Sequence, residues 1–309
     1  MAFLYLSEPS RGEIWRGAFA RDLPDLPFFA NTDEVLDPST VRYLAAWVPP
    51  ANLSSAYANL ELVFSVGAGV DQFDLSRLPP QVQVVRMLEP GIEAMMVEYA
   101  TMAVLALHRN LPTYLAQQRA GVWRSHRPTP ATQRRVGVMG VGRLGQGVLR
   151  ALRPFQFPLA GWSRERRSVD DVVCFAGKDE LPAFLERTDI LVCLLPLTAE
   201  TTGLLNKATF ARLPKGAALV HMGRGAQLDD GALVEALDTG QLSAAVVDVM
   251  SPEPPPEGHA IWQDPRIILT PHIAAATDAV AGARFVLETV KNHRAGLPIE
   301  GVVDRTRGY

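Results

Sequence analysis

Residues 134–167 of the chain read RRVGVMGVGRLGQGVLRALRPFQFPLAGWSRERR. The apolar residues at the start of this stretch predict a strand, and a helical spacing of apolar residues predicts a helix over 144–152. Between these two elements, residues 140–145 read GVGRLG, which has the spacing G-x-G-x-x-G, and a second apolar run at 159–162 predicts the next strand. This context is typical of a dinucleotide-binding unit, although a glycine-rich turn of any α/β protein is the alternative.

Each of the three glycines in this motif has a physical reason to be there. Gly140 permits a tight turn away from the strand, Gly142 lets the main chain approach a pyrophosphate, and Gly145 lets the helix pack closely on the sheet. The N–H groups at the start of the helix, together with the helix dipole, favour an anion. We therefore expect a cofactor-binding turn that also includes Arg143 and Leu144.

The residues that follow the second strand indicate which dinucleotide binds. An NAD site usually has an acidic residue there to bind the ribose 2′-hydroxyl, whereas this chain has Ser163 and Arg164, with Arg166 close behind. A hydroxyl and a guanidinium suit a 2′-phosphate, because guanidinium binds phosphate through two hydrogen bonds. Glu165 is expected to point to solvent. NADPH is thus the predicted cofactor, with NADH, or a merely solvated basic loop, as the alternatives.

The composition indicates a soluble globular protein. The chain has 309 residues, of which 48% are hydrophobic, and a formal net charge of −3. This length suggests two domains of about 150 residues, and this charge favours neither nucleic acid nor an anionic membrane as a partner. Cys174 and Cys193 lie in apolar stretches and are expected to be buried thiols in a reducing compartment. With neither a signal peptide nor a membrane-spanning segment expected, the predicted location is the cytoplasm.

The chain as a whole alternates predicted strands with predicted helices, which is typical of parallel sheets. A long apolar helix at 93–120 is expected to be buried and to be kinked or divided at Pro112. From residue 135 the alternation is regular and predicts a doubly wound fold, with ligand sites at the carboxyl ends of its strands. Strands are expected at 3–6, 41–48, 60–66, 82–87, 136–139, 159–162, 190–195, 217–221, 244–249 and 267–270, and further helices at 144–152, 180–186, 207–211, 230–238 and 279–294.

Three polar residues follow predicted strands at the edge where ligands bind in such folds. Arg224 lies in Gly-Arg-Gly, Glu253 lies in Ser-Pro-Glu-Pro, and His272 follows Thr-Pro. Together they suit the reduction of a 2-keto acid: arginine can bind the carboxylate and polarise the keto oxygen, histidine can donate the proton, and a carboxylate can fix the tautomer of that histidine. Taken singly, they also fit a surface ion pair, a solvated loop acid and a capping histidine. The histidines of the chain show no spacing typical of metal ligands, so no metal is expected.

Two further features suggest contacts with other molecules. Gly67-Ala68-Gly69 follows a predicted strand, and its backbone N–H groups could bind a small carboxylate, with a plain turn as the alternative. Trp123 lies in a proline-bearing loop and suggests an interface, with a local packing anchor as the alternative.

These motifs resemble those of the D-isomer-specific 2-hydroxyacid dehydrogenase family, over nearly the whole chain. The resemblance rests on GAGVD at 67–71, the glycine motif, LPLT at 195–198, GRG at 223–225, the segment 248–254 and TPH at 270–272. It implies two doubly wound parallel-sheet domains. A Rossmann-type cofactor domain at 99–275 would be inserted in a flavodoxin-like substrate domain made of 1–98 plus 276–309.

The resemblance also implies roles for individual residues. Arg224, Glu253 and His272 would be catalytic, with His272 as the proton donor, and the family suggests a homodimer in which Trp123 approaches the partner's site. His221-Met222 departs from the asparagine and small residue of many members. The implied substrate contacts are Trp47, Ala68, Gly69, Arg224 and His272, and the implied cofactor contacts, besides the glycine turn and the 163–166 loop, are Leu195, Pro196, Met222, Gly223 and Asp248.

Within the family, the chain is most similar to the group that reduces glyoxylate and hydroxypyruvate. The stretches VGAGVD, GWSRERR and PLTAETTGLLN and the C-terminal VDRTRGY carry this similarity. The expected function is therefore NADPH-dependent reduction of small 2-keto acids. A dehydrogenase for a larger 2-keto acid, or a dinucleotide-sensing interaction protein without enzymatic activity, are the alternatives.

Overall fold

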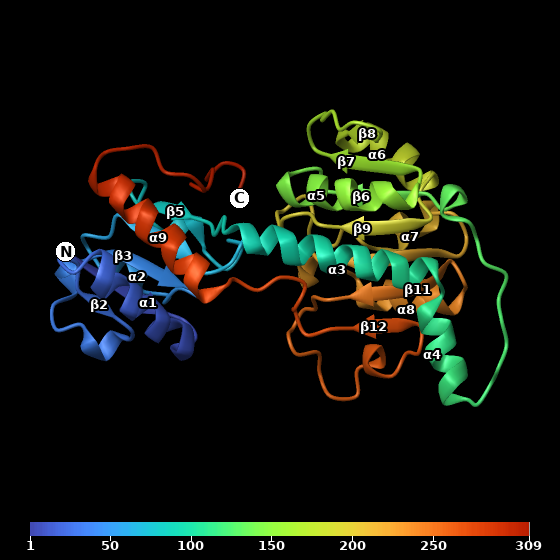
Figure 1. Cartoon of the computed structure of the whole chain (residues 1–309), viewed down its shortest axis with the longest axis horizontal. Coiled ribbons are helices and arrows are strands. Elements are labelled where there is room, and N and C mark those ends of the chain that lie inside the picture. Colours follow the sequence, from blue (N-terminus) through green and yellow to red (C-terminus); the bar gives the residue numbers. More distant parts are fainter. Residues whose placement is uncertain (309) are drawn as a thin grey trace. The chain divides into compact units, whose positions relative to one another are not determined.

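The computed structural model of the chain describes residues 1–308. These residues divide into two compact units, one formed by Met1–Ile92 together with the chain from Ala276 on, and the other by Glu93–Ala275. The first boundary lies at residue 92, in the first turn of helix α3 (Pro90–His108), and residue 98 lies further along the same helix. Each unit contains one parallel sheet, and Figure 1 shows the strands of both.

The first unit is built on a five-stranded sheet with the order β2-β1-β3-β4-β5. Helices α1 (Pro9–Asp22) and α9 (Ala279–Arg294) pack against each other, and a short helix, α2, covers Leu53–Ala56. Because α9 comes from the end of the chain, both ends of the sequence contribute to this unit. The strands are β1 (Ala2–Leu6), β2 (Phe28–Phe29), β3 (Val41–Ala46), β4 (Leu62–Ser65) and β5 (Gln83–Val85).

The four strands expected here are present. β1 begins one residue earlier than expected, and β3, β4 and β5 are shorter than expected. β3 stops at Ala46, because its pairing with β4 ends where Ala46 meets Ser65. Helix α1 is absent from the elements predicted from the sequence. Only Gly12, Trp15 and Phe19 of this helix are buried, so its sequence shows little apolar periodicity. Its start is nevertheless well defined, because the Glu8 side chain accepts hydrogen bonds from two backbone N–H groups of the first turn.

The second unit is built on a seven-stranded sheet with the order β12-β11-β10-β9-β6-β7-β8. The chain enters at β6, continues to β7 and β8 on one side, and then returns to build β9 to β12 on the other. The strand order thus reverses between β6 and β9, and ligands of open α/β sheets bind at such a point. The strands are β6 (Val136–Met139), β7 (Leu159–Ser163), β8 (Val173–Ala176), β9 (Ile190–Cys193), β10 (Ala217–His221), β11 (Leu242–Val247) and β12 (Ile267–Leu269).

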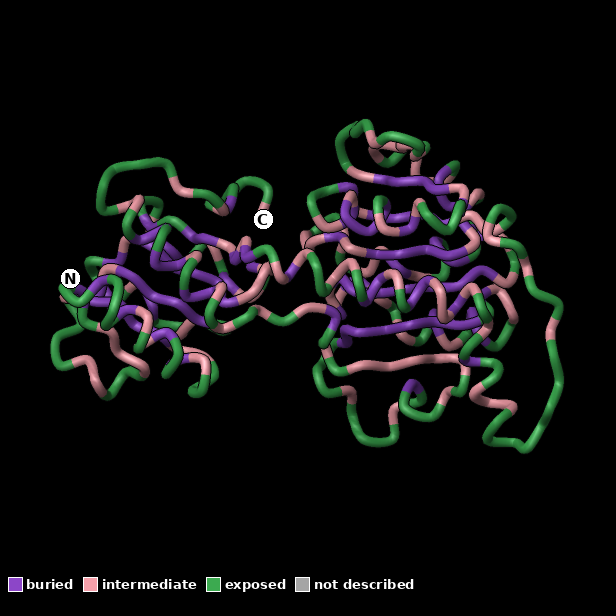
Figure 2. The backbone as a smooth tube through the Cα atoms, viewed as in Figure 1, coloured by how far each residue is buried: buried purple, intermediate pink, exposed green. Residues whose placement is uncertain are grey.

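Helices cover both faces of this sheet. Side chains of α3 and α5 (Arg143–Leu152) share one apolar core with Val220, whereas α6 (Gly177–Glu186), α7 (Lys207–Arg212) and α8 (Asp230–Asp238) share the other with Leu219. The strands between the two cores are mostly buried (Figure 2). The doubly wound α/β fold expected from the sequence is therefore confirmed.

Strand β8 is missing from the sequence-based prediction because it is an edge strand with few buried residues. Val173 is exposed, and Cys174 is only half-buried, so the expectation that both cysteines are buried is wrong for Cys174. Cys193 is fully buried in β9, and burial raises the pKa of its thiol to about 12. Both cysteines are free thiols.

The long apolar segment forms two helices, α3 and α4 (Leu111–Arg119), as expected for a chain divided at Pro112. The prediction that the apolar part of this segment is buried holds for one side of α3 only. One side, which includes Tyr99 and Val104, is buried, but Met95 and Met102 on the other are 39% and 49% exposed. From the sequence, no segment is expected to span a membrane, but α3 is long and apolar enough to do so by length and composition alone. The core helix of a soluble protein can have the same length and composition.

Candidate active site

The glycine turn after β6 has the geometry that its sequence predicts. Gly140 has a φ of +103°, a conformation that favours glycine. A Cβ on Gly145 would overlap the carbonyl oxygen of Gly140, so the helix can begin this close to the turn only with glycine there. A Cβ on Gly142, in contrast, would meet no atom within 4 Å. The main chain at Gly142 therefore faces open space at the start of α5, with Arg143 and Leu144 in its first turn.

The polar side chains at the end of β7 differ in the hydrogen bonds and ion pairs that they make within the protein. Ser163 is the last residue of β7, and its hydroxyl donates to the carbonyl of Glu165 at 2.7 Å. The side chain of Arg164 is about half exposed and lies 3.9 Å from the exposed carboxylate of Glu165. Arg166 instead pairs with Glu180 of α6 and donates to the carbonyl of Cys174 at 3.2 Å. Ser163 and Arg164 are therefore better placed than Arg166 to bind a phosphate beside this strand.

His272 and Glu253 follow adjacent strands and are hydrogen-bonded to each other. Nδ1 of His272 lies 2.9 Å from Oε2 of Glu253, and Oε1 of Glu253 accepts a hydrogen bond from the backbone N–H of Met250 at 3.0 Å. A carboxylate can only accept, so Nδ1 carries the proton and donates. Nε2 is then the nitrogen left to exchange a proton with a substrate.

The backbone at His272 has a positive φ of 55°, which a histidine adopts only with support from its surroundings. Its N–H donates to the carbonyl of Asp248 at 2.8 Å. The carboxylate of Asp248, which is only 2% exposed, accepts from the Thr270 hydroxyl at 2.5 Å and from the backbone N–H groups of Ile273 and Ala274 at 2.9 Å. Asp248 thus holds the segment on both sides of His272. These are the local contacts of a strand-end residue, and its expected contact with the cofactor stays a prediction.

The support for His272 extends to helix α3. The Tyr99 hydroxyl lies 2.5 Å from the hydroxyl of Thr270, which in turn donates to Asp248. Burial raises the pKa of Tyr99 to about 12, so the phenol stays protonated and available as a donor. The sequence patterns single out neither Tyr99 nor Thr270 as a polar partner, because Tyr99 lies in the middle of an apolar helix.

Arg224 lies three residues beyond the end of β10, between two glycines that have no room for a side chain. A Cβ on Gly223 would overlap the side chain of Gln227, and one on Gly225 would overlap the backbone of Met250. The guanidinium of Arg224 donates to the carbonyl of Gly223 at 2.9 Å. Strands β10, β11 and β12 are neighbours in a parallel sheet, so Arg224, Glu253 and His272 all follow strands at one edge.

Two buried polar residues beside Arg224 are not among the expected site residues. Gln227 is fully buried, and its side chain accepts from the backbone N–H of Arg224 at 2.8 Å. The sequence has no capping-box signal for it, because that motif begins with Ser or Thr and arginine has no acceptor. His221 is also fully buried at the end of β10. The expected cofactor contacts near them differ in exposure: Leu195 and Met222 are buried, whereas Pro196 is half-buried.

The backbone N–H groups expected to bind a substrate carboxylate, those of Ala68 and Gly69, lie in the first unit. Ala68 and Gly69 follow β4, and within residues 1–308 no protein acceptor bonds their backbone N–H groups. A Cβ on Gly67 would lie 2.8 Å from the indole ring of Trp47, so glycine is needed there for close approach. The Trp47 side chain is 42% exposed. The N–H groups of Ala68 and Gly69 stay the predicted donors to a small carboxylate.

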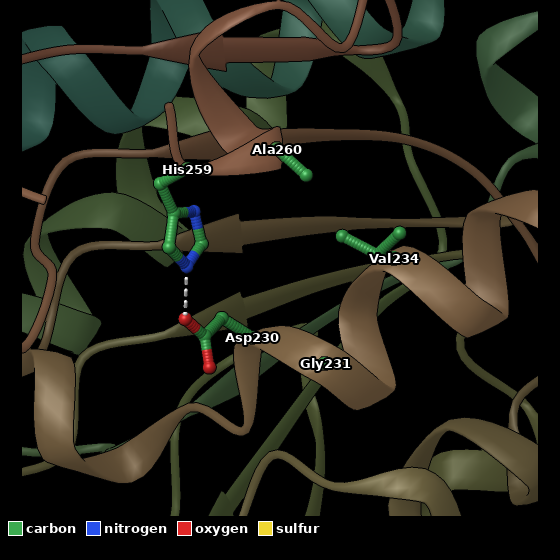
Figure 3. A pocket seen from close by; sticks show the side chains of 5 residues that line it. All are labelled: Asp230, Gly231, Val234, His259 and Ala260. Atoms are coloured by element: carbon green, nitrogen blue, oxygen red, sulfur yellow. Dashed lines mark hydrogen bonds and ion pairs between the residues drawn. The ribbon is translucent and has the colours of Figure 1, made fainter. Parts of the chain in front are cut away.

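A surface hollow of about 340 Å³ lies apart from all of these residues, at the start of α8 (Figure 3). His259 lies 2.7 Å from the carboxylate of Asp230 in it, and Val234 lines the same hollow. His259 Nδ1 accepts from the N–H of Ile261, so Nε2 donates to Asp230 and the pair ties a loop to the helix. None of the expected catalytic residues lines this hollow, and we assign it no catalytic role.

Comparisons with known proteins agree with the class of enzyme that these features define. Residues 101–274 match the family model described as D-isomer specific 2-hydroxyacid dehydrogenase, NAD binding domain. A glyoxylate/hydroxypyruvate reductase A from Klebsiella pneumoniae (strain 342) is 38% identical over 280 residues, which cover 88% of this chain and 89% of that protein.

Two solved structures are similar over the whole chain. One is a D-isomer specific 2-hydroxyacid dehydrogenase from Xanthobacter autotrophicus Py2 in complex with NADPH and MES, with a TM-score of 0.92, 36% identity and coverage of 100% of this chain and 99% of that one. The other is an NADPH-dependent glyoxylate/hydroxypyruvate reductase from Sinorhizobium meliloti in complex with NADP and sulfate, with a TM-score of 0.91, 33% identity and the same coverage.

The glycine turn at the switch point and the arginine, carboxylate and histidine at the same sheet edge define an NAD(P)-dependent oxidoreductase. The family match and the relatives show which kind: the chain belongs to the D-isomer specific 2-hydroxyacid dehydrogenase family. It is an NAD(P)-dependent 2-hydroxyacid dehydrogenase or reductase, as the sequence motifs predict.

Proposed function

We propose that this enzyme reduces small 2-keto acids, glyoxylate and hydroxypyruvate among them, with NADPH, and that His272 donates the proton. The observation that carries this proposal is the 2.9 Å hydrogen bond between Nδ1 of His272 and Glu253, on a strand edge that also bears Arg224. The names of the similar proteins from Klebsiella pneumoniae and Sinorhizobium meliloti support the choice of substrates.

The chemistry follows from the donors and acceptors of these residues. Bound NADPH supplies the hydride that adds to C2 of the keto acid. As C2 is reduced, negative charge develops on the keto oxygen, and the Nε2 proton of His272 moves to that oxygen and forms the hydroxyl. Glu253 stabilises the protonated imidazole and holds its orientation. Arg224 binds the substrate carboxylate and polarises the keto group.

The glycine turn and the end of β7 fit NADPH as the cofactor. The open space at Gly142 and the start of α5 suit a pyrophosphate. Ser163 and the half-exposed Arg164 suit a 2′-phosphate. The similar structures from Xanthobacter autotrophicus Py2 and Sinorhizobium meliloti were solved with NADPH and NADP.

Initial rates with NADPH and NADH, each paired with glyoxylate, hydroxypyruvate, pyruvate and phenylpyruvate, test this proposal. We expect the highest kcat/KM with NADPH and the two small acids. Arg164→Ala should lower the preference for NADPH, whereas Arg166→Ala, which removes an arginine already paired with Glu180, is the matched control and should change it less. Equal kcat/KM for the two cofactors would overturn the NADPH assignment, and turnover of phenylpyruvate alone would overturn the substrate assignment.

We also propose that the enzyme acts as a homodimer. Trp123 is fully exposed, and Met102 on α3 and Val122 beside Trp123 are 49% and 47% exposed, so large apolar side chains lie uncovered on this unit. Light scattering of the purified protein should give twice the chain mass of 33.7 kDa. A monomer mass at micromolar concentration would contradict the proposal.

A further inference from the structure

The peptide groups of Arg224 are held by side chains that come from both sides of it along the chain. His221 is the last residue of β10, and Gln227 ends the 3₁₀ turn that follows Arg224. Both side chains are fully buried. Buried polar side chains are costly unless they are hydrogen-bonded, so the bonds that these two make indicate what they do.

The two side chains bind the two polar groups of the Arg224 backbone. Oε1 of Gln227 accepts from the N–H of Arg224 at 2.8 Å. Nε2 of His221 lies 3.0 Å from the carbonyl oxygen of Arg224, and because a carbonyl only accepts, this nitrogen is protonated and donates. The N–H of Arg224 is therefore held by the Gln227 side chain. Its C=O is held by the His221 side chain together with the backbone N–H of Gln227, which donates to the same oxygen at 3.0 Å.

Arg224 needs this support because its two chain neighbours are glycines, which provide no side-chain contact; one bond to a neighbour runs from the guanidinium to the carbonyl of Gly223. Gly223 and Gly225 have no side chains, and tight packing excludes any other residue at both positions. A Gly-Arg-Gly segment has high backbone freedom unless it is held. The direction in which the guanidinium leaves the backbone therefore depends on the bonds from His221 and Gln227.

Unlike His221, Gln227 makes further hydrogen bonds among the described residues, to a second segment of the chain. Its Nε2 donates to the carbonyls of Leu195 and Pro196 at 3.2 and 2.9 Å. It thus joins the Arg224 segment to the loop after β9, where cofactor contacts are expected. Among the described residues, the His221 side chain makes one hydrogen bond, to the carbonyl of Arg224.

We infer that His221 and Gln227 are positioning residues that orient Arg224 toward the carboxylate of the 2-keto acid. The inference rests on the proposed function, because it assigns Arg224 to that carboxylate. It distinguishes the two supports: loss of His221 should weaken substrate binding alone, whereas loss of Gln227 should weaken the binding of both substrate and cofactor.

Steady-state kinetics of the full-length enzyme with glyoxylate and NADPH test the inference. In His221→Leu, which keeps similar volume but donates no hydrogen bond, we expect the KM for glyoxylate to rise about tenfold through misplacement of the guanidinium. The KM for NADPH should stay within about twofold, by the same reasoning. In Gln227→Met both KM values should rise. Thr188→Val is the matched control: it removes a fully buried hydroxyl that bonds the carbonyl of Phe184, far along the chain from Arg224, and it should change neither KM.

The outcomes separate the inference from the proposed function. Wild-type enzyme without turnover of any 2-keto acid would overturn the proposed function. Wild-type turnover combined with an unchanged glyoxylate KM in folded His221→Leu would overturn only the inference. Equal effects of His221→Leu and Thr188→Val would also overturn it, since general loosening would then explain the result. If His221→Leu does not fold, the glyoxylate KM of Gln227→Met decides by the same criterion.

Discussion

The buried imidazole of His221 makes the stability of the second unit dependent on pH. Burial lowers the pKa of His221 from 6.5 to about 4, and the nearby Arg224 guanidinium acts in the same direction. The hydrogen bond to the Arg224 carbonyl opposes this shift without cancelling it. Nδ1 has no hydrogen-bond partner among the described residues. A proton added at Nδ1 would therefore have no acceptor in the native fold.

The sign of the effect follows from proton binding in the two states. Between pH 6.5 and about 4 the unfolded chain binds a proton at His221 and the folded chain does not. The free energy of unfolding that depends on a neutral His221 is therefore present in full above pH 6.5, and it is lost as the pH falls toward 4. From pH 7 to pH 5, the loss amounts to about 2 kcal/mol, or about a twentyfold increase in the population of the opened state.

Hydrogen exchange followed by mass spectrometry can measure this loss within the second unit. Protection of the β10 amides, corrected for intrinsic exchange at each pH, gives the free energy of opening. We expect this energy to fall by about 2 kcal/mol more in wild type than in His221→Asn, whose amide does not titrate. The comparison uses the change with pH, so a constant destabilisation of the variant cancels. Identical pH dependence in the two proteins would refute the reasoning.

Three further predictions address other parts of the chain. His272→Ala should lower kcat by about 10²- to 10⁴-fold, as expected for loss of a general acid; initial rates at saturating substrate would reveal a near wild-type kcat, which would contradict its role. Gly145→Ala should abolish NADPH binding, measured by fluorescence titration, because the added Cβ overlaps the Gly140 carbonyl; wild-type affinity would contradict this. Arg305→Lys should destabilise the first unit by about 2–3 kcal/mol, because the guanidinium donates to four carbonyls that one ammonium cannot reach together; unchanged exchange of the β5 amides would exclude such a role.

Much of the fold could be predicted because apolar periodicity and glycine chemistry are local. Strand β10 and helices α8 and α9 have the expected bounds, and the turn at 140–145 has the expected backbone. The errors concern properties that depend on distant neighbours. Strand β8 lies at a sheet edge, where one-sided pairing weakens the apolar pattern, and α3 has an exposed side that its apolar composition conceals.

The residues of the candidate site also fall into two groups, those with a local sequence signal and those that depend on distant neighbours. Arg224, Glu253 and His272 were predictable because each follows a strand and each has a side chain with an evident chemical use. Tyr99 and Asp248 cooperate across about 150 residues of sequence, and no local pattern connects them. Their cooperation exists only because α3 packs on the sheet and brings a phenol to the Thr270 hydroxyl.

This difference between the two groups has a physical cause in their burial. The proposed proton donor and its carboxylate partner are partly open, with the side chains of His272 28% and Glu253 41% exposed. Those that hold them in place, Asp248, His221 and Gln227, are at most 2% exposed. A group that exchanges protons with a ligand must be accessible, whereas a group that fixes a backbone is most rigid where water cannot compete for its hydrogen bonds. The residues that fix the backbone therefore lie among buried apolar residues. A polar side chain in such surroundings indicates that it is hydrogen-bonded to another group of the protein. On this reasoning a buried polar residue at a strand end, such as His221, deserves a mutational test as early as the reactive groups themselves.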